Sequence, residues 1–280
     1  MKNIELHMHP FLERYKISDV VKAMDKTGLD VVGMVSLDNS IFPYILSESK
    51  RIYPNAKADD FGVRIDGKYL LNAREYNTKE NLQVLTIGYS MDCSPETDLR
   101  RIIDSGLQNN SLVLLDHPFA DNGDTKTAGH IPESLAQDLE NLCKEYSGEV
   151  CLEWNGYCIP WVRKFLRHGL NSFGFNIKYH DVNKKTQELS NSLKEEGYNV
   201  PVVTDTDLHA RRKRHLQYIG KSRITAPLLG EDPGELVHSL CEKIFEGNYE
   251  NNKKFVSYPV MLRTLGAPLI LSDYVQKPRG

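Results

Sequence analysis

Two histidines near the start of the chain have the spacing of a metal-binding pair. Glu5, His7 and His9 lie at the end of a strand predicted over Asn3–Leu6. Because side chains alternate along a strand, we expect these three residues to share one face and Ile4, Leu6 and Met8 to share the other. Two adjacent imidazoles can bind one metal ion. The alternative is a pair of surface histidines, so the rest of the sequence must decide.

A second pair of this kind follows another strand. Asp207 and His209 come directly after a strand predicted over Val200–Thr204 and would again project together. Further oxygen and nitrogen donors follow the intervening strands: Asp38, Asn39, Glu75, His117, Glu153 and Asn155. Such donors suit Zn, Mn or Fe. Each donor alone has an ordinary explanation as a helix cap or a turn, but the set favours a metal site.

The elements that must position these donors alternate between strands and helices. We predict strands at Asn3–Leu6, Val31–Ser36, Val63–Leu71 with an Asp66-Gly67 hairpin turn, Leu82–Tyr89, Leu112–Leu115, Val150–Glu153 and Val200–Thr204. We predict helices from Ser18 to Met24 (ended by Gly28), from Ser94 to Gly106, and at Pro132–Tyr146, Ile159–His168, Asn183–Glu196 and Asp232–Phe245. This alternation indicates a parallel α/β protein, and its length suits a closed barrel, in which strand ends converge on one mouth.

Composition limits the classes of function. The 280 residues carry 35 Lys and Arg against 38 Asp and Glu, a net charge of −3, so a general nucleic-acid binder is not expected. No stretch predicts a membrane helix or a signal peptide, and the five cysteines form no close pairs. We therefore expect a cytoplasmic protein with a single domain over 1–280, its core within about 1–250, and a C-terminal extension over 251–280.

In order and spacing, these motifs resemble the PHP (polymerase and histidinol phosphatase) family from residue 5 to about 220. The opening acid and H-x-H motif matches Glu5, His7 and His9, and a family G-L-D stretch resembles Gly28-Leu29-Asp30, running on to Asp38-Asn39. The later motifs are matched by Glu75, His117-Pro118, Glu153-Trp154-Asn155, Asn183-Lys184 and Thr206-Asp207-Leu208-His209.

The resemblance implies a distorted (β/α)7 TIM-like barrel of the PHP type with one to three divalent ions (Zn, Mn or Fe). His7, His9, Glu75 and Asp207 would bind one ion. Glu75 would bridge to a second ion held by His117 and Glu153. His209 would bind an ion or protonate the leaving group.

Three residues depart from the family pattern. Asn39 stands where the family usually has a histidine, Arg14 where an acid or histidine often completes a further site, and Gln83 where one more histidine is common. Amides and guanidinium groups are poor metal ligands. Arg14 is instead suited to hold a phosphate through its planar donor fork.

The function that we predict is a metal-dependent phosphoesterase that attacks a small phosphorylated substrate with metal-activated water, with His117, His209 and Arg14 as catalytic residues. The three departures motivate an alternative, a catalytically reduced PHP-like module that binds a phosphorylated ligand or partner. A third candidate is a hydrolase of C–N or C–O bonds. Arg211–Arg214 is either a solvated turn or a rim that attracts anions. We expect specificity to lie in this stretch, in Ser40–Phe61 and in the 119–130 loop; the substrate and the oligomeric state are not encoded in any motif.

Overall fold

The computed structural model describes residues 1–37, 40–80, 82–92, 97–120, 133–160 and 181–264. Its strands form a single sheet. The strands are β1 (Lys2–Pro10), β2 (Val31–Ser36), β3 (Lys57–Asp59), β4 (Gly62–Ile65), β5 (Lys68–Asn77), β6 (Gln83–Ile87), β7 (Leu112–Asp116), β8 (Val150–Asn155), β9 (Val202–Asp205), β10 (Leu208–Ala210), β11 (Arg223–Ala226) and β12 (Glu250–Asn252). The helices are α1 (Ile17–Thr27), α2 (Ile41–Ile52), α3 (Leu99–Gln108), α4 (Glu133–Glu145), α6 (Val182–Glu195), α7 (Pro233–Phe245) and α8 (Tyr258–Thr264), with a 3-10 helix η1 (Lys213–Tyr218).

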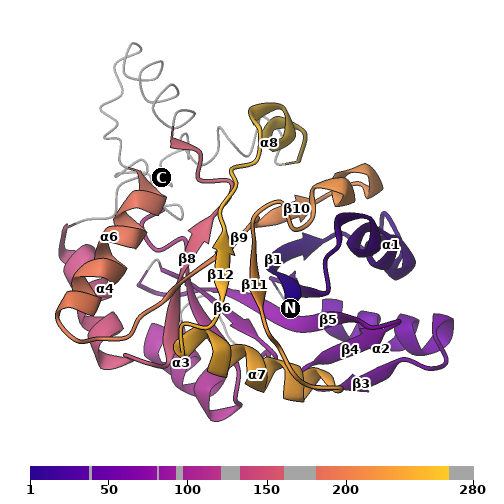
Figure 1. The fold of residues 1–280 in the computed structure, drawn as a ribbon, viewed down its shortest axis with the longest axis horizontal. Coiled ribbons are helices and arrows are strands. Elements are labelled where there is room, and N and C mark those ends of the chain that lie inside the picture. Colours follow the sequence, from indigo (N-terminus) through magenta and orange to yellow (C-terminus); the bar gives the residue numbers. More distant parts are fainter. Residues whose placement is uncertain (38–39, 81, 93–96, 121–132, 161–180, 265–280) are drawn as a thin grey trace, which may run out of the picture.

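Seven described strands curve into a nearly closed barrel in the order β1-β2-β5-β6-β7-β8-β9 (Figure 1). The chain leaves β9 and returns at once as β10, which pairs with β1 in parallel through Met8 and Leu208. Glu5 helps to close the remaining gap, because its carboxylate accepts the backbone N–H groups of Thr206 (2.8 Å) and Gly220 (3.1 Å). The predicted fold class, a distorted α/β barrel, is confirmed.

One barrel strand runs against the others, which the simple strand–helix alternation did not anticipate. β6 is antiparallel to both β5 and β7. Only residues 78–82 separate β5 from β6, too few for the crossover that a parallel pair needs. The barrel mouth is therefore lined by the first residue of β6, Gln83, rather than by its last.

The hairpin predicted at Asp66-Gly67 is present between β4 and β5. Both turn residues have positive φ, 49° for Asp66 and 80° for Gly67, the geometry that fits the twist of a two-residue hairpin. The preceding segment, Ser40–Phe61, contains helix α2 and strand β3, for which the sequence analysis had assigned no element. Phe42 and Ile45 anchor α2 in the outer core beside β2.

The helix ends follow local capping chemistry. Gly28 ends α1 as predicted, with a left-handed φ of 67°. The predicted cap, Ser18, instead lies inside the first turn, and the Asp19 carboxylate accepts the Lys16 N–H at 3.1 Å. The expected start of α3 at Ser94 and the helix expected at Ile159–His168 fall largely or wholly outside the described residues. So does the 119–130 loop beyond Ala120. None of the described helices has both the length and the apolar character needed to cross a bilayer.

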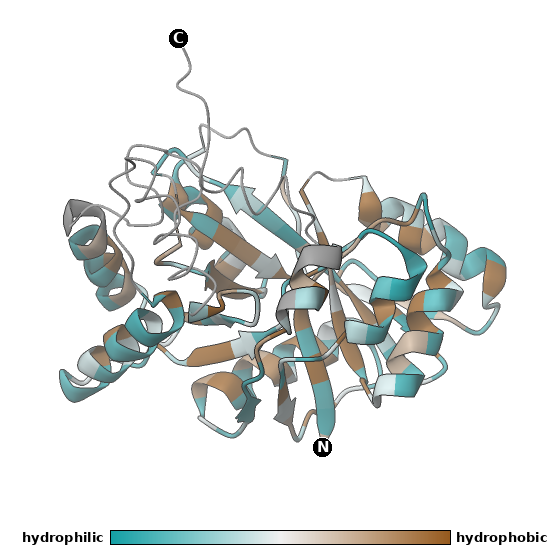
Figure 2. Ribbon diagram, turned by 90° about the horizontal axis from the view of Figure 1, so that it is seen from above, coloured by the Kyte–Doolittle hydropathy of each residue, from teal (hydrophilic) through white to brown (hydrophobic). Residues whose placement is uncertain are grey.

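The apolar core has an inner and an outer part. One buried cluster takes residues from every barrel strand, among them Ile4, Val35, Ala73 and Leu114, and so fills the barrel interior. Helix α7 adds Leu236 and Leu240 to it, which closes the lower end. Two further clusters pack the other helices against the outside of the barrel. In Figure 2 the central strands are largely apolar, and the peripheral helices carry both apolar and polar residues.

A β-bulge in β1 sets the direction of the two N-terminal histidines. Glu5 pairs with Val32 and Met8 with Met34, so that Leu6 and His7 together face Gly33. Ile4 and Leu6 belong to the inner cluster, whereas Met8 belongs to an outer one. The expectation that Glu5, His7 and His9 share one face is therefore wrong. The bulge shifts the alternation by one residue, so His7 and His9 turn inward while Glu5 does not share their face.

Gly33 makes the bulge possible. A Cβ at this position would lie 2.1 Å from the backbone oxygen of Leu6. We expect Gly33→Ala to lower the free energy of unfolding by about 1–3 kcal/mol, the usual cost of overpacking, and to disturb the histidine pair. Urea unfolding measures the first effect and metal content the second. Unchanged stability together with unchanged metal content would contradict this role.

Candidate metal centre

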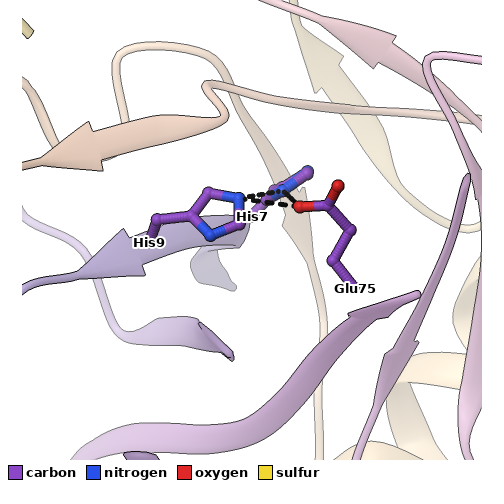
Figure 3. Close-up of side chains that lie close together, drawn as sticks. All are labelled: His7, His9 and Glu75. Atoms are coloured by element: carbon purple, nitrogen blue, oxygen red, sulfur yellow. Dashed lines mark hydrogen bonds and ion pairs between the residues drawn. The ribbon is translucent and has the colours of Figure 1, made fainter. Parts of the chain in front are cut away.

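Four side chains converge at the mouth of the barrel. The distances from His7 Nε2 are 2.9 Å to His9 Nε2, 3.6 Å to Glu75 Oε2 and 3.4 Å to Asp207 Oδ1. His9 Nε2 lies 3.0 Å from Glu75 Oε2 and 3.6 Å from Asp207 Oδ1. Figure 3 shows the two rings and the Glu75 carboxylate directed toward one another. We call these residues the upper quartet.

Most distances within the upper quartet suit a shared metal ion. Metal–ligand bonds of about 2.0–2.2 Å place tetrahedral ligand atoms about 3.4 Å apart. The five distances above lie between 2.9 and 3.6 Å. By proximity of ligand atoms, Glu75 is grouped with His7 and His9, and Asp207 with His9 and His209. Asp207 Oδ1 is buried and accepts no hydrogen bond from the described residues. An unsatisfied carboxylate oxygen facing two imidazole nitrogens is what a cation-binding site requires, so the residues present fit a divalent metal.

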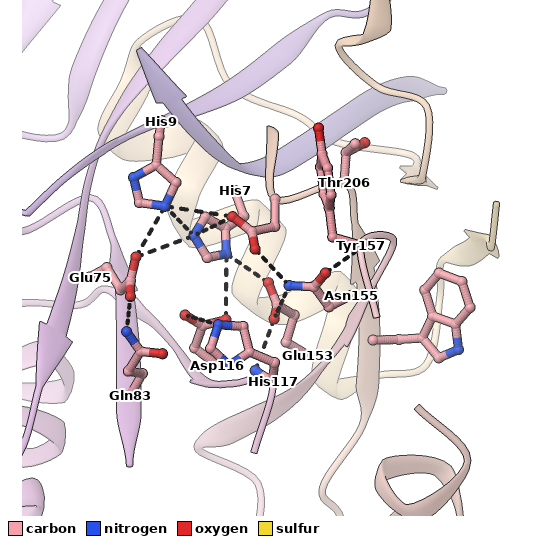
Figure 4. Close-up of polar contacts among 12 residues, drawn as sticks. His7, His9, Glu75, Gln83, Asp116, His117, Glu153, Asn155, Tyr157 and Thr206 are labelled. Carbon is pink, nitrogen blue, oxygen red and sulfur yellow. Dashed lines mark hydrogen bonds and ion pairs between the residues drawn. The ribbon is translucent and has the colours of Figure 1, made fainter. Parts of the chain in front are cut away.

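Hydrogen bonds beneath the upper quartet hold its ligands in place. His7 Nδ1 lies 2.7 Å from Glu153 Oε1, which orients the His7 ring with Nε2 toward His9. The Asn155 amide donates to Glu153 Oε2 at 3.1 Å and to Asp207 Oδ2 at 3.0 Å (Figure 4). The Gln83 amide donates to Glu75 Oε1. His7, Glu75 and Asp207 thus each have one atom directed at the centre and one held by a neighbour.

A lower layer of acids lies behind His7. Asp116 and Asp205, the last residues of β7 and β9, are completely buried, as is Glu153. Asp116 Oδ1 is 3.5 Å from His7 Nδ1. None of the four carboxylate oxygens of Asp116 and Asp205 has a hydrogen-bond partner among the described residues. The sequence analysis named Glu153 but missed these two aspartates.

Backbone geometry explains why Asp116 was missed. Asp116 lies two residues after the inner residue Leu114, so its side chain faces inward as regular alternation requires. The adjacent His117 also reaches the site, because its φ is 24°. Regular alternation allows only one of two neighbours to face inward. Asp205 was detectable, because it shares the i, i+2 pattern with the inner residue Val203 and with Asp207. Asp207 is also strained, with a φ of 55°, as is common at functional sites.

The carboxylates control the protonation of the buried histidines. Burial by itself lowers the pKa of His7, but the charges of Asp207, Asp116 and Glu153 outweigh it and raise that pKa well above its usual value. Burial and the neighbouring His209 lower the pKa of His9, which favours the neutral imidazole that a metal needs. Hydrogen bonding to His7 and His9 overcomes burial and holds the pKa of Glu75 well below its usual range.

The pKa values of the acids in the lower layer shift upward, in contrast to that of Glu75. Burial and the adjacent Glu153 carboxylate raise the pKa of both Asp116 and Asp205 well above the usual value. Burial also raises the pKa of Glu5 to about 7. No described Lys or Arg forms an ion pair with any of these buried acids; their charged neighbours are histidines. Carboxyl groups therefore outnumber cationic side chains in the described part of the site, as in a site built for cations.

His209 and Arg14 lie toward the open side. His209 stacks on His9 with ring centroids 4.3 Å apart, and its Nε2 is 3.3 Å from Asp207 Oδ1. Arg14 is half exposed and donates to the Arg211 backbone oxygen at 3.4 Å. The guanidinium groups of Arg14 and Arg211 lie 5.8 and 5.9 Å, respectively, from the centroid of the Phe11 ring. Arg211 Nε has no described partner, and burial together with Arg14 lowers the Arg211 pKa.

The basic stretch after His209 divides into two parts. Arg211 is partly buried beside Phe11, whereas Arg212, Lys213 and Arg214 are exposed. Lys213 pairs with Asp19 of α1 at 2.8 Å. Arg211 is therefore the best candidate in this stretch for attracting an anion. The other three residues fit the alternative of a solvated turn.

The other expected ligands fall into a separate group. His117 and Glu153 lie together with Asp116, while Glu75 is grouped with His7 and His9. A bridge from Glu75 to a second ion at His117 stays a prediction. Asp38 and Asn39 lie outside the described residues.

Comparison with known proteins gives similarity at the level of the fold. No family model and no curated protein sequence matches the chain. Among solved structures, PsfC from Pseudomonas syringae PB-5123 aligns over 97% of this chain and 96% of its own, with a TM-score of 0.53 and 12% identity. The lesion-specific endonuclease PfuEndoQ from Pyrococcus furiosus aligns over 89% of this chain, with a TM-score of 0.52 and 14% identity. This chain spans 57% of the endonuclease. The shared barrel and the His/Asp/Glu clusters are consistent with a PHP-like protein.

Divalent metal should stabilise the fold because it offsets the buried negative charge. At a free concentration ~100 times its dissociation constant, Mn²⁺ or Zn²⁺ should stabilise the protein by about 2.7 kcal/mol, seen as a rise in Tm that a chelator reverses. Asp207→Asn should weaken binding by more than about tenfold, whereas Asp138→Asn on exposed α4 should not. Equal metal-induced shifts in all three proteins would contradict the assignment of the quartet.

Proposed function

We propose that this protein is a metal-dependent phosphoesterase that acts on a small phosphorylated substrate. The observation that carries the proposal is the upper quartet, whose spacing and unsatisfied Asp207 oxygen suit a divalent ion. Arg211 hydrogen-bonds through its backbone to His209, and Arg14 donates to the Arg211 backbone oxygen, so both would supply positive charge at the open side. A cation site beside two guanidinium groups is complementary to a phosphate ester, which carries its charge on several oxygens.

The positions of the charged groups support this choice of substrate class. Arg14 and Arg211 are close enough to share the Phe11 ring. Arg14 forms an exposed ion pair with Glu13 at 3.3 Å, whereas the Arg211 guanidinium forms no ion pair with a described acid. Arginine binds phosphate through paired N–H donors. The proposed orientation places the phosphate between the arginines and the upper quartet, with the ester oxygen toward His209.

The chain's own residues then divide the chemistry. A divalent ion bound by the quartet would lower the pKa of a coordinated water toward about 7, which supplies a nucleophile at neutral pH. Glu153 and Asn155 keep His7 and Asp207 oriented. Arg14 and Arg211 bind the non-bridging oxygens and stabilise charge that develops on them. His209, the most exposed of the imidazoles at this mouth, is placed to donate a proton to the leaving oxygen.

A panel of phosphoesters tests the activity. With Mn²⁺ or Zn²⁺ added, the wild-type protein and Asp138→Asn should hydrolyse at least one small phosphomonoester, and Asp207→Asn should not. His209→Gln should slow esters with poor alkyl leaving groups by about 10²–10⁴-fold and activated aryl esters much less, because only the former need a proton donor. Nucleic acids with and without lesions belong in the panel, since hydrolysis confined to them would replace a small substrate by a polymer.

The arginines can be tested through inhibition by inorganic phosphate. Arg14→Ala and Arg211→Ala should each raise the phosphate inhibition constant by roughly tenfold or more, because a hydrogen bond between charged groups contributes about 1.5–3 kcal/mol. Arg51→Ala is the matched control, because Arg51 is exposed on α2 and paired with Glu48. The same inhibition constant in all variants would exclude a phosphate site at these arginines.

One outcome would favour the alternative of a catalytically reduced module. The Gln83 amide occupies one oxygen of Glu75, and amides do not readily replace charged or imidazole ligands. Tight phosphate binding without turnover of any ester, in protein shown to contain metal, would identify a binding module.

A further inference from the structure

The segment that follows β12 packs against the end of the barrel that carries the candidate metal centre. Its helix α8 contacts β10, the strand on which His209 lies (Figure 1). Val256 and Met261 are buried in the outer apolar cluster to which β10 also contributes. The Val256 N–H donates to the backbone oxygen of Gly156 at 3.1 Å. We call residues 253–264 the C-terminal segment.

A pair of buried hydroxyl groups joins the C-terminal segment to the loop after β8. The Tyr157 hydroxyl oxygen lies 2.5 Å from Thr264 Oγ1. Thr264 donates its own hydroxyl proton to the backbone oxygen of Val260 at 3.0 Å, so Tyr157 is the donor of the pair. Only 8% of Tyr157 is exposed, and Thr264 is fully buried. A buried hydroxyl without a partner is unfavourable, so this bond ties the position of Tyr157 to that of the C-terminal segment.

Tyr157 in turn fixes the side chain of Asn155. The Tyr157 N–H donates to Asn155 Oδ1 at 2.8 Å. The nitrogen of the same amide donates to Glu153 and to Asp207, which is a member of the upper quartet. Ionised carboxylates only accept hydrogen bonds, so the amide can hold them only with its nitrogen toward them. The Tyr157 N–H selects this orientation, because in the reversed orientation it would face another donor.

The backbone around Asn155 is held separately. The Asn183 side chain of α6 accepts the Asn155 N–H at 2.9 Å and donates to the Asn155 backbone oxygen at 2.8 Å. The Gly156 N–H donates to the Asp205 backbone oxygen at 3.0 Å. A Cβ at Gly156 would lie 3.2 Å from the backbone oxygens of both Asp205 and Lys254, so the C-terminal segment fits closely over this turn. With the main chain fixed in this way, the part of Asn155 that the C-terminal segment can control is its side chain.

We propose that Tyr157 and Thr264 are positioning residues of the candidate metal centre. Their hydroxyl pair keeps the C-terminal segment docked on the loop after β8, and the docked loop holds the Asn155 amide against Asp207. Docking of the C-terminal segment and binding of a divalent ion by the upper quartet then favour each other, because both require the same orientation of Asn155. This proposal rests on metal binding at the barrel mouth, which the proposed function also needs, but not on the hydrolysis of any ester.

Calorimetric titration of Mn²⁺ into full-length protein stripped of metal with a chelator tests the proposal. Tyr157→Phe and Thr264→Val each remove the hydroxyl pair and should weaken Mn²⁺ binding by roughly threefold to tenfold, the effect of one neutral hydrogen bond. The double variant should bind Mn²⁺ no more weakly than either single variant, because all three lack the same bond. Thr264→Ser keeps a hydroxyl group and should bind Mn²⁺ as the wild-type protein does.

Tyr146→Phe is the matched control. Tyr146 is also a buried tyrosine, but its hydroxyl donates to Asp104 of α3 at 2.7 Å. This variant should lower the Tm of the metal-free protein without changing its Mn²⁺ affinity. Hydrogen–deuterium exchange adds a second readout, since Mn²⁺ should slow exchange of the α8 backbone amides in the wild-type protein and much less in Tyr157→Phe. Circular dichroism must show that each variant is folded, and Thr264→Val tests the same bond if Tyr157→Phe does not fold.

Wild-type Mn²⁺ affinity in both Tyr157→Phe and Thr264→Val would overturn the proposal, as would effects that add in the double variant. Equal weakening in Tyr146→Phe would also overturn it, because the loss would then reflect general destabilisation. The expected affinities in a protein that hydrolyses no phosphoester would support the positioning role and reject the proposed function. Unchanged affinities in a protein that does hydrolyse them would support the function and reject this role. A wild-type protein that binds neither Mn²⁺ nor Zn²⁺ would overturn both.

Discussion

The structure around the barrel mouth depends on the need to neutralise buried carboxylates. Glu75, Asp116, Glu153, Asp205 and Asp207 are all less than a tenth exposed. Within the described chain their charged neighbours are imidazoles, and no lysine or arginine forms an ion pair with them. Leaving such groups unpaired is costly, so the arrangement requires shared protons or bound cations. The perturbed pKa values and the unsatisfied oxygens follow from this concentration of charge.

Two departures from regular strand geometry make that concentration possible. The bulge in β1 turns both His7 and His9 inward, and it exists because Gly33 has no side chain to meet Leu6. The positive φ of His117 lets two consecutive residues of one strand end face the same site. Both features bring more ligands to the mouth of the barrel than strict alternation of side chains would allow. The cost is local strain, which the surrounding apolar core offsets.

Most of the barrel could be predicted from the sequence, because its strands are short apolar runs separated by helix and turn signals. The mouth could be anticipated as well, since His7, His9, Glu75, Asp207 and His209 follow those strands. Sequence alone could not supply the bulge, which is a relation between β1 and β2, nor the reversal of β6. The predicted direction of the Glu5 side chain was wrong because of this bulge. Asp116 was missed because His117 beside it had the clearer signal and the alternation rule admits only one of the two.

The gap in the barrel between β9 and β1 has a mechanical consequence. Along the rest of the wall, adjacent strands are joined directly by backbone ladders. Here the described contacts are the short β10 pairing with β1, the Glu5 carboxylate and the hydrogen bonds between Thr206 and Ser222. His7 and His9 stand on one side of this junction, and Asp207 and His209 stand on the other. An ion shared by these residues would cross-link the two sides of this junction. The same coordination bonds that create a reactive centre would then also determine whether the barrel stays closed or opens between β9 and β1.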